Sequence, residues 1–351
     1  MTLQRVLAPV VLLCGSLLVA FGVLEFSLRV LYPPPAVFVY PQEFYDIDPE
    51  IGYMLRPLQT AFTHDRPVRT SSLGLRDREI APDPTPGTIR VLALGDSQTF
   101  GNGLAGSDTW PRQLERTLNE TAPNRWEVVN AGVPGTDTWQ HEILLRRLLK
   151  ATRPHVVVLA FYVNDVAPRW NLRGMNTSGQ TNTWKKRVTY LLKRSAVLTV
   201  IYHRLLPAWY AWQHGQGLST EDAVLAGSHD EPAERGWRQV DQSLGVMSEL
   251  CRAREMVFVV AILPRRDQVS GDRFWRAYND RVRAIAEAHG IRVVDLLTSL
   301  SEAYRVRGDA LFITWDGHNS AAANQVIAES LSPVLEDLVS QGERRHPAAT
   351  R

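Results

Sequence analysis

The chain has 351 residues, which is enough for one large domain or two ordinary ones. Its 39 Lys and Arg nearly balance its 37 Asp and Glu, so the formal net charge is only +2. No basic stripe interleaved with aromatic residues indicates a nucleic-acid partner, and none is expected. The two cysteines, Cys14 and Cys251, are not expected to pair, and no Cys/His cluster has zinc spacing. We therefore expect no metal and no organic cofactor.

The N-terminus contains an almost wholly apolar run. Residues 6–24 carry no charge, and the run is long enough to cross the ~30 Å hydrocarbon layer of a bilayer as a helix. Arg5 and the amino terminus precede it, which favours a cytoplasmic N-terminus. A signal peptide cleaved after Gly22 and a buried core helix are the alternatives. We expect residues 1–32 to be a membrane anchor or a signal; either places the rest of the chain outside the cytoplasm, in the periplasm of a Gram-negative cell.

The next segment, residues 33–87, is rich in proline and turn residues. Three consecutive prolines at 33–35 end the first helix and begin a stiff, extended linker. Residues 40–78 have few long apolar runs, so we expect a strand-poor arm that lies over the following domain. Residues 81–87, with three prolines, form a second linker.

From residue 88 onward, short apolar strands alternate with amphipathic helices. Five strands are expected, at residues 89–94, 126–130, 155–162, 256–263 and 291–296. Helices are expected at residues 109–121, 138–152, 236–254, 273–288 and 320–335. Continuous apolar strands alternating with helices imply a parallel sheet covered on both faces. The fold class is therefore α/β, a three-layer α/β/α sandwich with a mostly parallel five-stranded sheet at residues 88–340, followed by a disordered tail at residues 341–351.

Residues 166–235 interrupt this rhythm between the third and fourth strands. This insertion contains a basic, aromatic helix candidate at residues 184–214 and a polar loop at residues 215–232. A helical cap over the site, a membrane-surface helix and an ordinary packed insertion all fit the pattern. The sequence leaves these three interpretations open.

Each of the first three strands is followed by polar residues or glycine. Ser97 follows the first strand, Asn130 and Gly132 end the second, and Asn164 and Asp165 follow the third. Open α/β sheets bind ligands beyond the carboxyl ends of their strands. We therefore expect these residues to lie at one crevice.

A serine nucleophile needs a base to take its proton, and the best candidate is His318. Side chains two residues apart in an extended or turning segment face the same way, so Asp316 can orient His318. The other histidines lie in helices, at a strand start, or in the arm, insertion and tail. The alternative for Asp316 and His318 is a helix cap with a surface histidine.

An acyl-transfer site also needs donors aimed at the developing oxyanion. The N–H of Ser97, the N–H of Gly132 and the side-chain amide of Asn164 are the candidates, with turn or cap chemistry as the alternative for the last two. The charge of Asp165 opposes an oxyanion, so we assign it a structural role. Asp96 is expected to hold the turn or a nearby amide.

Four segments of the chain resemble, in order, the sequence blocks of the SGNH or GDSL-type hydrolases. These segments are Gly95-Asp96-Ser97, Asn130-Ala131-Gly132, Asn164-Asp165 and Asp316-Gly317-His318. The resemblance implies a flavodoxin-like fold and serine-dependent ester chemistry. It also implies Ser97 as nucleophile, His318 as base and Asp316 as its orienter, with Ser97, Gly132 and Asn164 forming the oxyanion hole.

The chain departs from the family pattern at two places. Tyr162 stands where the third block usually has glycine, and the last block is Asp-x-His where much of the family has Asp-x-x-His. The shorter spacing is similar to that of extracytoplasmic polysaccharide O-acetyltransferases. The expected function is a serine-dependent hydrolase of O-acyl esters outside the cytoplasm. The alternatives are an O-acyltransferase that modifies a cell-envelope glycan, and a non-catalytic glycan-binding or scaffold protein.

Overall fold

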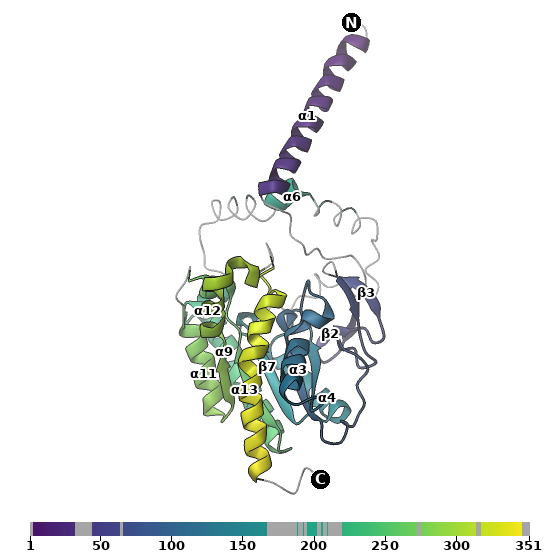
Figure 1. Cartoon of the computed structure of the whole chain (residues 1–351). Coiled ribbons are helices and arrows are strands. Elements are labelled where there is room, and N and C mark those ends of the chain that lie inside the picture. Colours follow the sequence, from purple (N-terminus) through teal and green to yellow (C-terminus); the bar gives the residue numbers. More distant parts are fainter. Residues whose placement is uncertain are drawn as a thin grey trace. The chain divides into compact units, whose positions relative to one another are not determined.

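The computed structural model describes most of the chain (Figure 1). The described residues are 3–31, 44–63, 66–166, 188, 192, 195–201, 205, 209, 220–271, 275–313 and 317–345. They fall into two compact units, and each is described by itself. One unit comprises residues 1–41 and 182–217, and the other comprises residues 42–181 and 218–351.

The larger unit is built on a five-stranded parallel sheet with the order β6-β5-β7-β8-β9. The strands are β5 (Ile89–Gly95), β6 (Trp126–Gly132), β7 (Val156–Phe161), β8 (Val257–Ile262) and β9 (Arg292–Asp295). All five expected strands are confirmed, with ends that differ from the expected ones by at most two residues. Gly95 at the end of β5 pairs in register with Gly132 of β6 and Ala160 of β7. The carboxyl ends of these three strands therefore meet at one edge of the sheet.

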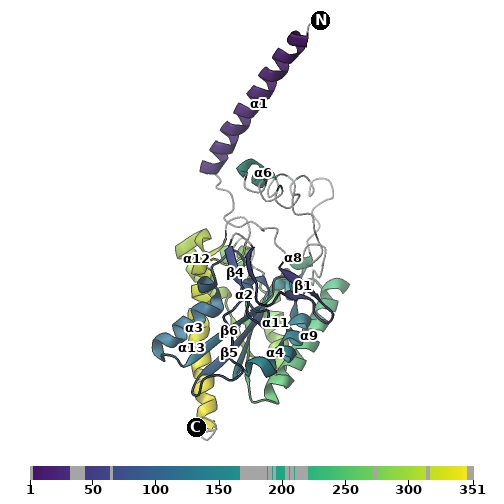
Figure 2. The same ribbon diagram turned by 90° about the vertical axis from the view of Figure 1, so that its right-hand side faces the viewer.

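Helices cover both faces of this sheet, as expected for a three-layer sandwich (Figures 1 and 2). One face carries α3 (Trp110–Thr121), α12 (Leu297–Arg307) and α13 (Ala321–Arg345), and the other carries α4 (Thr138–Thr152), α9 (Glu231–Arg252) and α11 (Ala277–Ala288). Alternate residues of β5 supply the two cores. Val91 and Ala93 pack with the first set of helices, and Leu92 and Leu94 pack with the second.

The expectation of a strand-poor arm is wrong. Two antiparallel hairpins occupy this region: β1 (Tyr45–Asp48) with β2 (Gly52–Leu55), and β3 (Thr60–Thr63) with β4 (Arg66–Arg69). Each strand has four residues, too short to show a clear alternation in sequence. Tyr53, Leu55 and Val68 are nevertheless buried in the core on the α4 side of the sheet. The arm does lie over the domain, as expected, but as hairpins that contribute to its core.

Several helix boundaries also differ from the expected ones. The helix expected to start at Gly236 begins at Glu231, because Asp230 caps it and Pro232 occupies its first turn, where proline is tolerated. The polar loop before it contains α8 (Thr220–Leu225). The final helix continues to Arg345, so residues 341–345 are helical and not part of a tail.

The smaller unit contains the apolar N-terminal helix α1 (Leu3–Leu31) and the short helix α6 (Ala196–Val200). Within Pro9–Leu31 of α1, an 18-residue stretch has a mean hydropathy of 2.2, and 0% of it is buried. This exposure contradicts the buried core helix among the alternatives and is consistent with a signal anchor or a signal peptide. Most of the helix candidate at residues 184–214 lies outside the described residues. Cys14 and Cys251 are free thiols.

Candidate active site

Ser97 lies at the turn between β5 and α2 (Ser97–Phe100), at the carboxyl edge of the sheet. The turn depends on Gly95, which has a φ of 151°. A Cβ atom at this position would lie 2.2 Å from Thr99 Oγ1 and 3.1 Å from the Ala160 carbonyl oxygen. These contacts leave no room for a side chain at Gly95. Ser97 is the first residue of α2 and follows β5, a strand that is buried along its whole length.

His318 reaches the same place from the other end of the chain. Its loop is narrow: Phe312 and Asn319 form an isolated antiparallel bridge, and the Ile313 N–H donates to the His318 carbonyl at 2.8 Å. Gly317, with a φ of 78°, allows the loop to turn. The Asn319 N–H donates to Gln98 Oε1 at 3.1 Å, which joins the loop to α2.

These two elements bring the serine hydroxyl and the histidine ring into hydrogen-bond contact. The distance between Ser97 Oγ and His318 Nε2 is 2.8 Å, across 221 residues of sequence. Such contact is the geometric requirement for a base that takes the proton of a serine nucleophile. Asp316, the expected orienter of His318, lies outside the described residues.

Asp96 and Asn164 connect the ends of β5 and β7. The buried Asp96 carboxylate accepts a bond from the Gln98 N–H at 2.9 Å, which caps α2. It also accepts a bond from Asn164 Nδ2 at 2.9 Å, and Ser97 Oγ lies 3.4 Å from the same oxygen. Burial, followed by the nearby charge of Asp165, raises the pKa of Asp96. Both roles expected of Asp96, holding the turn and holding an amide, are present.

Gly132 has a different environment from the expected one. Its N–H donates to Asn130 Oδ1 at 3.0 Å, so the proposed oxyanion donor already has a partner. A Cβ atom at Gly132 would lie 2.2 Å from the Phe100 nitrogen. Asn130 also donates to the Thr99 carbonyl at 2.9 Å. Together these contacts give Asn130 and Gly132 a packing role, because they let α2 lie directly against the end of β6.

A buried polar network lies behind the loop that carries Asn164. Asp165 accepts bonds from the Tyr162 N–H at 2.8 Å and Thr138 Oγ1 at 3.1 Å, which supports its structural role. His141 Nδ1 lies 3.3 Å from Asp165, and both side chains are completely buried. Burial alone would lower the pKa of His141, but the carboxylates of Asp165 and Asp137 outweigh it and raise this pKa. The Asp165 carboxylate, which holds the Asn164 loop, therefore favours the protonated form of the His141 ring.

Sequence reasoning missed the contribution of Arg76, which comes from the arm. Its buried guanidinium donates to the carbonyl oxygens of Phe100, Gly101 and Leu104 at 2.8, 2.6 and 2.5 Å. It also lies 4.6 Å from the centroid of the Phe100 ring. These carbonyls follow the end of α2, where a cation is favoured. Nothing in the sequence marks this arginine, because its partners are backbone atoms.

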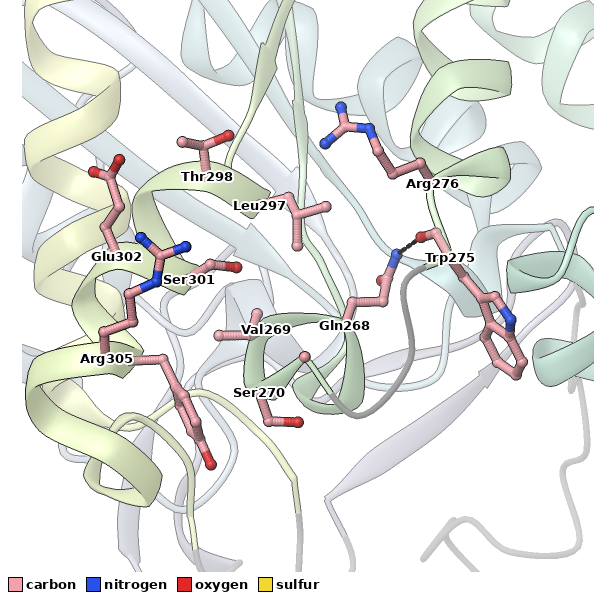
Figure 3. A pocket seen from close by; sticks show the side chains of 12 residues that line it. Gln268, Val269, Ser270, Trp275, Arg276, Leu297, Thr298, Ser301, Glu302 and Arg305 are labelled. Atoms are coloured by element: carbon pink, nitrogen blue, oxygen red, sulfur yellow. Dashed lines mark hydrogen bonds between the residues drawn. The ribbon is translucent and has the colours of Figure 1, made fainter.

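A separate cavity of about 390 Å³ lies between α10 (Arg266–Ser270) and α12 (Figure 3). In it, Gln268 Nε2 donates to the Trp275 carbonyl at 2.6 Å, and the guanidinium groups of Arg276 and Arg305 lie at its two sides. Neither Ser97 nor His318 lines this cavity. We assign no catalytic residue to it.

The described arrangement is suited to acyl transfer. Ser97 Oγ contacts a base, and its own N–H lies at the start of a helix, where backbone donors point toward an anion. The amide of Asn164 has two N–H donors, and Asp96 accepts one of them.

Comparison with known proteins agrees with this chemistry. The model of the GDSL-like lipase/acylhydrolase family matches residues 93–326, which include Ser97, Gly132, Asn164 and His318. Solved structures similar to this chain include that of TesA, with 20% sequence identity and a TM-score of 0.43, covering 71% of this chain and 99% of that chain. The lipase/acylhydrolase from Enterococcus faecalis has 14% identity and a TM-score of 0.41, covering 71% and 96% of the two chains. The esterase EstA from Pseudoalteromonas sp. has 14% identity and a TM-score of 0.41, covering 72% and 98%.

At these identities and scores the structural likenesses add nothing to the family assignment. Among curated proteins no match was found. The family model itself matches more than half of the chain, from the strand before the serine to the helix after the histidine. On that match, the chain belongs to the GDSL-like lipase/acylhydrolase (SGNH) family and is a carboxylic ester hydrolase.

Proposed function

We propose that this hydrolase acts through an acyl-enzyme on Ser97, with His318 as the general base, and that it acts outside the cytoplasm on an O-acyl ester. The observation that carries the proposal is the 2.8 Å contact between Ser97 Oγ and His318 Nε2. A helix cap with a surface histidine would not require this contact.

In the proposed first step, His318 Nε2 takes the hydroxyl proton as Ser97 Oγ attacks the acyl carbon. The resulting imidazolium then gives this proton to the oxygen of the leaving alcohol, and the acyl group remains on Ser97. In the second step, His318 takes a proton from water as the water oxygen attacks the acyl carbon. The bond between this carbon and Ser97 Oγ then breaks, and the imidazolium returns the proton to Oγ. The products are a carboxylic acid, an alcohol and the free serine.

The proposed oxyanion donors are the Ser97 N–H and the second N–H of the Asn164 amide. Gly132 remains a proposed donor only if its N–H leaves Asn130, because it donates to that side chain at 3.0 Å.

Asp316 is the proposed partner of His318. The argument is the spacing of two residues and the left-handed Gly317 between them, which allows the chain to turn. An Asp316→Asn variant should keep the fold and lower kcat, because a neutral amide does not stabilise the imidazolium.

The location is proposed from α1. Residues Pro9–Leu31 are apolar, exposed and long enough to span a bilayer, and a positive charge precedes them. Membrane fractions washed with alkaline carbonate, followed by protease treatment of intact cells or spheroplasts, test this proposal. An uncleaved chain in the membrane, with its catalytic unit digested from outside, is the expected result.

An O-acyltransferase that modifies a cell-envelope glycan is the second candidate, favoured by the Asp-x-His spacing and the proposed anchor. The same residues would serve, but a sugar hydroxyl would replace water in the second step. Incubation with a donor ester and candidate glycans separates the two activities. A hydrolase releases free acid alone, whereas a transferase gives an acylated glycan.

The sharpest test needs no knowledge of the substrate. A serine-directed phosphonate should label the purified protein, and peptide mapping should place the label on Ser97. The Ser97→Ala variant should not be labelled, and His318→Ala should be labelled far more slowly. Labelling at another serine, or equal labelling of Ser97→Ala, would refute the nucleophile assignment.

A further inference from the structure

Residues 182–217, which belong to the smaller unit, differ sharply in composition from the rest of the chain. They contain six Lys and Arg and no Asp or Glu, although the whole chain is nearly balanced. They also contain three Trp and three Tyr, a large share of the ten of each in the chain. Cationic side chains together with Trp and Tyr are typical of segments that lie at a membrane surface.

Four described apolar side chains of this segment, all outside α6, are exposed. The exposed fractions are 44% for Val188, 52% for Leu192, 58% for Leu205 and 54% for Trp209. The members of each pair, 188 with 192 and 205 with 209, are four residues apart, a spacing typical of one side of a helix. Two such pairs in a basic segment rich in Trp and Tyr favour an apolar partner for it.

The structure attaches this segment to α1 at a defined level. Ser195 Oγ donates to Glu25 Oε2 at 2.7 Å, and the N–H groups of Ala196 and Val197 donate to the same carboxylate at 2.9 and 3.1 Å. Arg29 also binds Glu25. Glu25 lies six residues before the end of α1, about 9 Å along the helix. Residues 195–197, at the start of α6, are therefore attached to the last turns of α1, where a spanning helix would leave the hydrocarbon.

We propose that residues 182–217 dock on the headgroup layer of an anionic lipid bilayer beside α1. In this arrangement Leu205 and Trp209 enter the interface, and the six basic side chains pair with lipid phosphates. Continuity with α1 favours lipid over a protein partner, because residues 195–197 bind α1 close to the end of the proposed span. The inference depends on the proposal that α1 spans the membrane, and the experiment tests the two separately.

The experiment uses the full chain in vesicles and one nitroxide spin label at a time. A Cys251→Ala variant carries the label on the native Cys14, inside the proposed span. With Cys14→Ser added, the label is placed at Leu205→Cys or at Val306→Cys. Val306 is the matched control, because it is an apolar residue, 86% exposed, on α12 of the catalytic unit. The measurement is the ratio of label accessibility to oxygen, which dissolves in lipid, and to a nickel chelate, which dissolves in water.

The vesicles are phosphatidylcholine alone, or phosphatidylcholine and phosphatidylglycerol in equal parts. In the mixed vesicles we expect a label at position 205 to have nearly the same oxygen-to-nickel accessibility ratio as a label at position 14. This ratio should be several-fold higher than that of a label at position 306. Changing Lys185, Lys186 and Arg187 to Gln should reduce the ratio at 205. An unchanged ratio would refute the role of charge.

The other outcomes separate the two proposals. The surface docking is overturned, and the anchor is left intact, if a label at position 14 is more accessible to oxygen while a label at position 205 is more accessible to the nickel chelate. Low accessibility of the 205 label to both reagents also overturns the docking, because it places the segment against protein. A label at 14 that prefers nickel overturns the anchor itself, and the docking with it.

Discussion

The two halves of the candidate site are held in very different ways. Ser97 follows a seven-residue strand that pairs on both sides, and its turn is capped by Asp96. His318 stands on a narrow loop, and the described bond between this loop and α2 runs from the Asn319 N–H to Gln98 Oε1. Strand pairing on both sides of β5 positions Ser97, whereas the described contacts of the histidine loop are the bonds within it, the bond to Gln98 and the contact with Ser97. Changes on the histidine side should therefore affect catalysis more than folding.

The largest expected effect tests whether the two halves act as one unit. Ser97→Ala and His318→Ala should each lower kcat/KM for a short aryl ester by at least about 10⁴-fold, because each removes one end of the same proton transfer. The double variant should be no worse than either single variant. Multiplication of the two losses would show that the residues act independently.

The next largest effect is expected for Asn164, the proposed oxyanion donor that follows β7. Asn164→Ala should lower kcat by roughly 10²–10³-fold with little change in KM, as for a donor that binds more strongly in the transition state. The Asn164 amide also bonds Asp96, so the unfolding transition of the variant must be measured in urea. A loss confined to KM would argue against an oxyanion role.

A change at Gln98 tests how far the position of His318 depends on the bond between its loop and α2. Gln98→Leu should lower kcat and slow phosphonate labelling about 10-fold, since the loop that carries His318 loses its bond to α2. Gln268→Leu is the matched control: Gln268 is equally buried and bonds the Trp275 carbonyl and Asn279, away from Ser97. Both variants should lose about 1–2 kcal/mol of stability. Equal kinetic losses in the two variants would refute the special role of Gln98.

A change at Arg76 tests whether Ser97 keeps its position when the residues that follow it lose their bonds to this guanidinium. Arg76→Met removes three charge-assisted bonds from the carbonyls after α2 and should cost about 3 kcal/mol in the free energy of unfolding. The folded protein should keep kcat within about 10-fold of the original, because β5 and Asp96 still position Ser97. An Arg76→Met variant with unchanged stability and a large loss of kcat would contradict this expectation. Urea titration and active-site counting by phosphonate separate the two quantities.

The smallest effect is the pH dependence from the buried network. The folded pKa of His141 is raised by Asp165 and Asp137, with a smaller effect of Asp96, so its stabilising contribution is complete below the unfolded pKa of about 6.5. That contribution is lost as the pH rises through the folded value. Burial raises the pKa of Asp137 to about 7, which also makes stability fall with rising pH, between about 4 and 7. Above pH 6.5 the original protein should lose more stability than His141→Gln, and parallel curves would contradict this.

Much of this architecture could be predicted because its signals are local. Strands such as β5 and β7 are continuous apolar runs, and polar residues or glycine mark the ends of the first three strands. The hairpins of the arm gave no such signal, because strands of four residues are too short for a pattern. Arg76 could not be identified either, since it recognises backbone carbonyls, which any sequence provides. The bond from the Gly132 N–H to Asn130 Oδ1 could not be predicted either, because it depends on the orientation of the Asn130 side chain.

By itself, the sequence determined the α/β class, the order of the five strands along the chain and the residues that meet at their carboxyl ends. Hydrophobic periodicity and strand-end chemistry are properties of neighbouring residues, so they are readable without a fold. The tertiary structure alone decided that His318 reaches Ser97 and that the Gly132 N–H donates to Asn130. It also decided that the insertion binds α1 through Glu25. These are contacts between distant segments, and their geometry arises only when the chain has packed.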